Sequence, residues 1–92
     1  LNSLPSEEEY LSWAKSQAYL ALGNMLTTCA AIGLDACPME GFVTEKYDDI
    51  LNLNERNLTT AVIANLGFRD EDDIFINMKK VRWPHENFIV RM

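Results

Sequence analysis

The sequence is poor in the residues that build metal sites and disulfide frameworks. It contains one histidine, His85, and two cysteines, Cys29 and Cys37, among 92 residues. One histidine excludes a metal site built from several imidazoles. Two cysteines cannot supply the several bridges that staple small secreted domains. We therefore expect a reduced, cytoplasmic chain without a metal.

Basic residues and long apolar runs are also scarce. Eight lysines and arginines stand against fourteen acids, which gives a net charge of −6. Nucleic acids and anionic membranes bind basic surfaces, so neither is expected as a partner. No apolar run reaches the ~18 residues of a candidate membrane span, and no signal peptide is expected from the first residues. The first residue is leucine, which fits a processed or truncated product.

Hydrophobic residues, in contrast, are abundant for so short a chain. They make up 48% of it, including two Trp, three Tyr, four Phe and four Met. A chain of this size forms at most one small domain and buries only about 60 to 65% of its unfolded surface. We therefore expect residues 1–92 to form a single unit that packs against something beyond itself.

A strong helix signal lies near the start of the chain. In the segment 4–9, LPSEEE, Ser6 can cap a helix and Glu9 can complete a capping box. The helix is predicted to cover residues 7–32, and Gly33 supplies the left-handed residue that ends it. Apolar side chains surround the helix in its second half, which predicts burial on most sides.

The later elements predict an α+β fold. Thr44 is expected to cap a short helix over residues 45–51. The β-branched, apolar segment 58–66 predicts a strand covered on both faces. The acidic run 70–73 predicts an exposed turn, and the alternation in 87–92 a final strand. Because one central strand cannot make a sheet, further strands are expected from missing sequence or a second subunit.

The predicted loop 34–42 is the first segment that could bind a ligand. It contains the run Pro38-Met39-Glu40-Gly41. Pro38 fixes one backbone torsion and Gly41 permits close approach, so the loop could present main-chain N–H groups to a flat ligand. The residues alone favour a plain turn between two helices over such a loop.

The second candidate is the basic cluster 79–84. Alternation places Lys80 and Arg82 on one side of an extended segment, where an ammonium and a guanidinium could hold one phosphate. A solvated surface strand that balances nearby acids explains these residues equally well. No catalytic side chain is identified, since Cys37 has no histidine near it in sequence to act as a base.

Several motifs in a fixed order resemble one known family. They are Trp13, then QAYLALGN (17–24), AAIGLD (30–35), CPMEGF (37–42), LGFR (66–69) and KVRWP (80–84). Together they resemble the C-terminal half of the nitroreductase family of FMN flavoproteins, over nearly the whole chain. The resemblance implies an α+β fold with a long central dimer helix and strands of a mixed sheet. It makes residues 1–92 the C-terminal portion of an FMN-binding domain whose N-terminal half is absent.

The resemblance also implies a flavin site between the subunits of a homodimer. Residues of the Pro-x-Glu-Gly loop would lie by the isoalloxazine ring and the late Lys-x-Arg pair on the phosphate; here these are Pro38, Met39, Glu40, Gly41, Lys80 and Arg82. The implied activity passes hydride from NAD(P)H through FMN to a nitroaromatic, quinone or similar small acceptor.

The family's N-terminal flavin contacts are missing from this sequence. The chain alone is therefore expected to be an inactive fragment that needs a second copy or a complementing N-terminal half. The alternative is a non-catalytic truncated or split-gene piece, which dimerises through its long helix or complements another subunit.

Overall fold

The computed structural model describes residues 4–92, and its dominant element is the helix α1, Glu7–Ile32. The Ser6 hydroxyl accepts the Glu9 N–H, and the Glu9 carboxylate accepts the Ser6 N–H. This reciprocal pair satisfies two N–H groups at the helix start. Gly33 ends the helix with φ 77°, in the left-handed region. The predicted bounds and both end signals are confirmed.

Two short strands follow the helix and pair with each other. β1 (Asp35–Met39) and β2 (Ile63–Gly67) form a two-stranded antiparallel sheet, with Asp35 opposite Gly67 and Met39 opposite Ile63. This pair of strands is called the hairpin below, although a long segment connects them. The prediction of a loop over residues 34–42 was wrong for 35–39, whereas residue 34 and residues 40–42 lie outside helices and strands. Proline is tolerated at position 38 because an edge strand leaves its missing N–H without a ladder bond to make.

The strand predicted over residues 58–66 is shorter than expected, and it begins at Ile63. The preceding segment bonds to the buried Asp48 instead of entering the ladder. The Asp48 carboxylate accepts the Thr59 hydroxyl at 2.6 Å, and the Thr60 N–H and hydroxyl at 2.8 and 2.7 Å. These bonds lower the pKa of Asp48, that from the Thr59 hydroxyl most. β2 is also not covered on both faces within the chain, since Leu66 is 49% exposed.

Asp48 belongs to α2 (Thr44–Ile50), which a short 3-10 helix, η1 (Asn54–Arg56), follows between the strands. Val43 occupies the N-cap of α2 and makes no side-chain cap bond. The prediction that Thr44 caps a helix over 45–51 was therefore wrong by one residue. Thr44 is the first helical residue. The prediction assumed that a hydroxyl caps the helix, but no side chain caps α2.

The segment after β2 contains turns and one short helix. Asp70 accepts the Asp72 N–H on its side chain at 2.9 Å and the Asp73 N–H on its carbonyl at 3.1 Å, so the predicted exposed turn is confirmed. The final strand predicted over 87–92 was wrong. That segment instead begins within α3 (His85–Phe88). Alternation alone does not make a strand, and residues 87–92 pair with no sheet edge in the described part of the chain.

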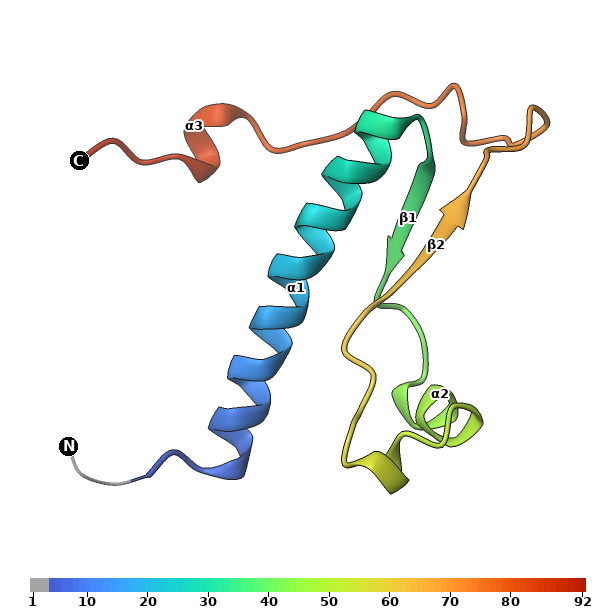
Figure 1. The fold of residues 1–92 in the computed structure, drawn as a ribbon. Coiled ribbons are helices and arrows are strands. Elements are labelled where there is room, and N and C mark those ends of the chain that lie inside the picture. Colours follow the sequence, from blue (N-terminus) through green and yellow to red (C-terminus); the bar gives the residue numbers. More distant parts are fainter. Residues whose placement is uncertain (1–3) are drawn as a thin grey trace.

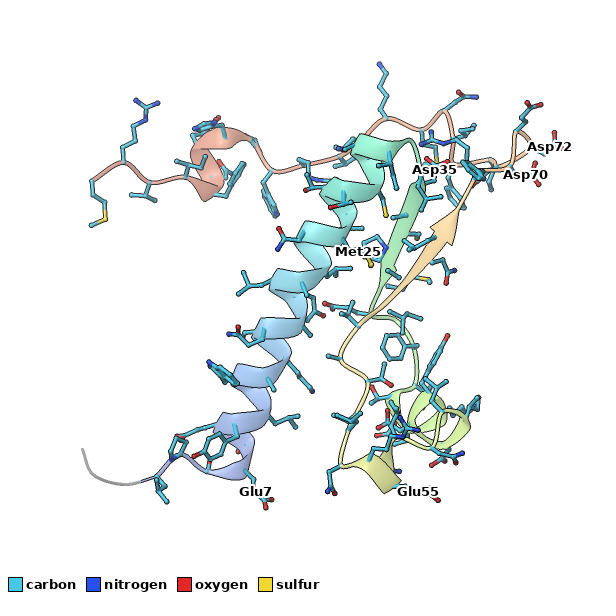
Figure 2. The ribbon with its side chains drawn as sticks, viewed as in Figure 1. Glu7, Met25, Asp35, Glu55, Asp70 and Asp72 are labelled. Atoms are coloured by element: carbon cyan, nitrogen blue, oxygen red, sulfur yellow. The ribbon has the colours of Figure 1, made fainter. Side chains whose placement is uncertain are left out.

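The elements are loosely arranged. In Figure 1, β1 and β2 lie beside α1, α2 lies at the end of the hairpin remote from the C-terminal end of α1, and the last segment crosses near that C-terminal end. α1 contacts β1, and Figure 2 shows Met25 of α1 in the space between helix and hairpin. The face of α1 that carries Met25 and the buried Cys29 is therefore its inner face.

The chain exposes far more surface than a self-contained protein of its mass. Its accessible surface is 8756 Å², whereas a compact 10.5 kDa protein exposes about 5400 Å². Its radius of gyration is 17.5 Å, against about 12 Å for a compact chain of this length. Cys29 is the one buried apolar residue among those described. The burial predicted for α1 is thus not provided by the chain itself.

Candidate functional site

The Pro-x-Glu-Gly run lies where β1 ends. Pro38 and Met39 are the last two residues of β1, and Glu40 and Gly41 follow it. The Phe42 N–H donates to the Glu40 carbonyl oxygen at 2.8 Å, which closes a three-residue turn centred on Gly41. The strand pairing of Met39 with Ile63 ties this turn to the sheet.

Among the described residues, neither backbone conformation nor crowding requires glycine at position 41, and similar open space surrounds the Cβ positions of the other three glycines. The φ of Gly41 is not positive, since Gly33 is the one glycine with a positive φ in the described residues. A Cβ added at Gly41 would meet no atom within 4 Å. The Gly41 N–H donates to no acceptor in residues 4–92. The turn therefore presents a free main-chain donor beside open space, the combination that a closely approaching ligand requires.

A side-chain hydrogen bond connects this turn to α1. The Tyr19 hydroxyl donates to Oε1 of Glu40. This hydrogen bond is the main cause that raises the pKa of Tyr19 above its ordinary value, with smaller contributions from burial and from the Glu40 charge. No pattern in the sequence pointed to the contact, because the two residues are 21 positions apart. Glu40 thus has a side-chain partner in addition to its expected main-chain role.

The basic pair lies in the irregular segment between β2 and α3. Lys80 and Arg82 are both exposed, and Arg82 Nη1 donates to the Val81 carbonyl oxygen at 2.7 Å. Neither forms an ion pair with an acid in the described residues. The segment is not a strand, so that part of the surface-strand interpretation was wrong, while the exposure of both side chains agrees with a solvated surface. Its two charges are available to an anion.

The chain does not bring the turn and the basic pair together. In Figure 1 the turn after β1 lies toward the α2 end of the hairpin, whereas the segment between β2 and α3 lies near the C-terminal end of α1. FMN is an extended molecule with a ring at one end and a phosphate at the other. A main-chain donor and a separate cationic pair match that chemistry, so the donor set fits FMN.

An ion pair closes the opposite end of the hairpin. The Arg69 backbone N–H donates to Asp35 Oδ2 at 2.8 Å, and its Nε and Nη2 donate to Oδ1 at 3.0 and 2.5 Å. These bonds lower the pKa of Asp35 to about 2. The Arg69 side-chain bonds have the largest effect and its backbone N–H the next, while burial acts in the opposite direction. Figure 2 shows Asp35 at this end of the hairpin, apart from the exposed Asp70 and Asp72. The pair joins the start of β1 to the residues that follow β2, at the end of the sheet where Asp35 lies opposite Gly67.

A wide cavity of about 560 Å³ lies beside this ion pair. Its wall includes apolar side chains of β2 and of the segment after it, together with the ion pair: Asp35, Leu66, Phe68, Arg69, Phe75 and Ile76. Phe68 is 85% exposed and Phe75 66% exposed. Sequence reasoning did not find this surface, because it forms only when 35–37 and 65–76 come together.

The described residues contain no group of three or more histidine, cysteine, aspartate or glutamate side chains that could hold a metal ion. No helix within residues 4–92 combines the length and apolar character needed to cross a membrane.

The long helix, the hairpin and the Pro-x-Glu-Gly turn define an α+β protein whose candidate site lies on an open surface. Comparison with known proteins assigns it to a family: residues 3–68 match the Nitroreductase family. Since this match covers more than half of the chain, the chain belongs to the nitroreductase family. The resemblance noted from the ordered motifs is confirmed.

Individual relatives agree with this assignment. A protein of Staphylococcus haemolyticus named "Putative NAD(P)H nitroreductase" is 38% identical over 88 residues, which are 91% of this chain and 38% of that protein. A Staphylococcus aureus protein of the same description matches with the same identity and coverage. The "Oxygen-insensitive NAD(P)H nitroreductase" of Salmonella typhimurium is 36% identical over 80 residues, 87% of this chain and 37% of that protein. The chain therefore spans a little over a third of the length of these curated relatives.

Proposed function

We propose that residues 1–92 are the C-terminal portion of an FMN-dependent, NAD(P)H-using oxidoreductase domain that reduces nitroaromatics, quinones or similar small acceptors. Family membership and the names of the relatives support the reaction class. The observation that carries the proposal is the turn at Gly41, whose free N–H and missing Cβ leave room for a flat ligand. This turn lies inside the matched region 3–68.

Six residues of the chain would hold the cofactor. The end of β1 and its turn would contact the flavin ring, and the basic pair would neutralise the phosphate: Pro38, Met39, Glu40, Gly41, Lys80 and Arg82. When bound, FMN supplies the chemistry, accepting hydride from NAD(P)H and passing it to the acceptor. The Gly41 N–H would contribute a preorganised dipole beside the ring. No side chain of the chain is assigned a proton-transfer role.

The site requires an assembly, either a homodimer or this chain with a complementing N-terminal half. The chain exposes about 3400 Å² more than a compact protein of its mass, the difference between 8756 Å² and about 5400 Å². A standard interface buries only about 800 Å² per partner. The excess is several times larger, which supports an extensive and obligate contact.

The second candidate is a non-catalytic subunit that uses α1 for dimerisation, and the same exposed surface favours it.

Visible absorption distinguishes the two functions, because bound flavin is yellow. The chain would be purified with its mass confirmed and titrated with FMN, first alone and then with a complementing N-terminal half. We expect no appreciable NAD(P)H oxidation by the chain alone. An oxidoreductase function requires bound flavin and turnover in the complemented sample.

If the chain and the N-terminal half formed a complex of the correct stoichiometry that bound no FMN and showed no turnover, the enzymatic proposal would be refuted. The non-catalytic subunit function would then remain. Turnover of around 1 per second or more by the chain alone with FMN would show instead that two copies build an entire site. That result would refute the fragment assignment, since hydride transfer needs the nicotinamide held at about 3 to 3.5 Å from a fixed flavin face.

A further inference from the structure

The Tyr19 hydroxyl makes the one side-chain hydrogen bond that joins α1 to another element in the described part of the chain. Of the other side-chain bonds of α1, the Glu9 carboxylate accepts the N–H of the cap residue Ser6, and the hydroxyls of Ser16, Thr27 and Thr28 donate to carbonyls of the same helix. Tyr19 instead donates to the Glu40 carboxylate at the end of β1. It is 39% exposed, so the bond lies at the margin of the contact between helix and hairpin.

The acceptor of this bond lies directly before the glycine with the free N–H. The Glu40 side chain is held by α1, and the Glu40 carbonyl oxygen accepts the Phe42 N–H at 2.8 Å. The peptide that links Glu40 to Gly41 is therefore held at Glu40 through two separate groups. Gly41 has no side chain, no atom lies within 4 Å of the position that a Cβ would take, and its own N–H makes no hydrogen bond in the described residues.

We propose that Tyr19 is a positioning residue, which holds the Glu40–Gly41 turn and thereby sets the direction of the Gly41 N–H. The meaning of that direction for FMN rests on the proposed function. A hydrogen bond to an ionised carboxylate is shorter and about twice as strong as a neutral one, so it can restrain a three-residue turn. Without the hydroxyl, the turn retains only its i→i+2 bond and the strand that precedes it.

The test compares two tyrosines of the same helix. Tyr19→Phe removes the hydroxyl and keeps the ring, and Tyr10→Phe is the matched control, since Tyr10 is 53% exposed and its hydroxyl makes no hydrogen bond in the described residues. The primary measurement is the ¹⁵N order parameter of the Gly41 amide in the chain within its assembly. We expect about 0.85 in the unmodified and Tyr10→Phe proteins and below about 0.6 in Tyr19→Phe.

A second variant tests the acceptor. Glu40→Gln keeps a side-chain oxygen and is expected to lie between the unmodified protein and Glu40→Leu, which has no acceptor. In the double variant Tyr19→Phe, Glu40→Leu, the order parameter should fall no further than in either single variant, because both remove the same bond. Additive effects would show that the two residues act separately, which would overturn the positioning role.

The FMN measurement separates this inference from the proposed function. If the assembly binds FMN, Tyr19→Phe should raise the Kd about threefold to tenfold, as expected for one lost hydrogen bond, and Tyr10→Phe should leave it unchanged. An assembly without FMN affinity would refute the proposed function, while the order parameters would still decide whether Tyr19 positions the turn. An unchanged Gly41 amide in Tyr19→Phe would overturn the inference whether or not FMN binds.

Discussion

The outer face of α1 gives the most direct test of whether this chain works in an assembly. Leu20 is 66% exposed and Trp13, two helical turns earlier on the same face, is 65% exposed. Both lie opposite the inner face, which carries Cys29. We expect Leu20→Glu to weaken self-association strongly, because a leucine available for burial becomes a charge that resists it.

The size of the effect follows from the exposed fraction. Complete burial of a leucine side chain stabilises by about 1.5 to 3 kcal/mol, so the two-thirds of Leu20 that remains exposed can contribute about 1 to 2 kcal/mol. In a symmetric dimer the residue occurs twice, giving about 2 to 4 kcal/mol, or roughly 30-fold to 1000-fold in Kd. Burial of the new carboxylates would add to this loss.

Sedimentation velocity over a range of micromolar concentrations measures the effect. The matched control is Leu51→Glu, which makes the same change at a leucine of similar exposure, 57%, at the end of α2. We expect Leu51→Glu to associate like the unmodified chain and Leu20→Glu to sediment more slowly. A monodisperse monomer for the unmodified chain would refute a homodimer through α1. Equal weakening by both substitutions would show that the contact is not specific to this helix face.

The basic pair, the hairpin ion pair and the helix cap can each be tested separately. In the FMN-binding assembly, Lys80→Ala and Arg82→Ala should each weaken FMN binding by about 1.5 to 3 kcal/mol if the two side chains bond the phosphate. Titration of the flavin absorbance measures the affinity. Unchanged affinity in both variants would show that the cluster is a solvated surface. The hairpin should lose the stabilisation from Asp35 as the pH falls from about 4 to about 2, because the pKa of Asp35 is about 2 in the folded chain and 3.8 ordinarily. NMR of the Arg69 Nε–H group follows this loss. If the hairpin of an Arg69→Ala variant opened in the same pH range, the assignment to this ion pair would be wrong. Ser6→Ala should lower the free energy of unfolding by about 1 kcal/mol through loss of the capping box, as measured by urea denaturation, whereas Ser12→Ala inside the helix should not.

Local chemistry made α1 predictable from the sequence. Its start depends on Ser6 and Glu9, which are three residues apart, and its end on Gly33, which tolerates the left-handed conformation. The turn at 70–73 was predictable for the same reason, because the Asp70 side chain accepts an N–H two residues on. Such signals act over one helical turn or less, so they can be read without the tertiary structure.

Strand pairing was not predictable in this way. β1 falls within the segment predicted as a loop, and its partner β2 lies opposite it only through contacts between distant residues. The Asp35–Arg69 pair spans 34 positions, and the bonds from Asp48 to Thr59 and Thr60 span 11 and 12. These bonds lie on either side of β2, and no local propensity encodes them.

The family, the long helix and the six candidate cofactor residues could all be read from the order of the amino acids, because ordered motifs and end signals do not depend on the packing. The folded chain was needed to show which groups meet. It joined Tyr19 to Glu40 across 21 positions and left Lys80 and Arg82 without an acidic partner in the described residues. It also showed the apolar outer face of α1 uncovered. These contacts could not be read in advance because a side chain's partner depends on how distant segments pack, whereas a helix end depends on the few residues around it.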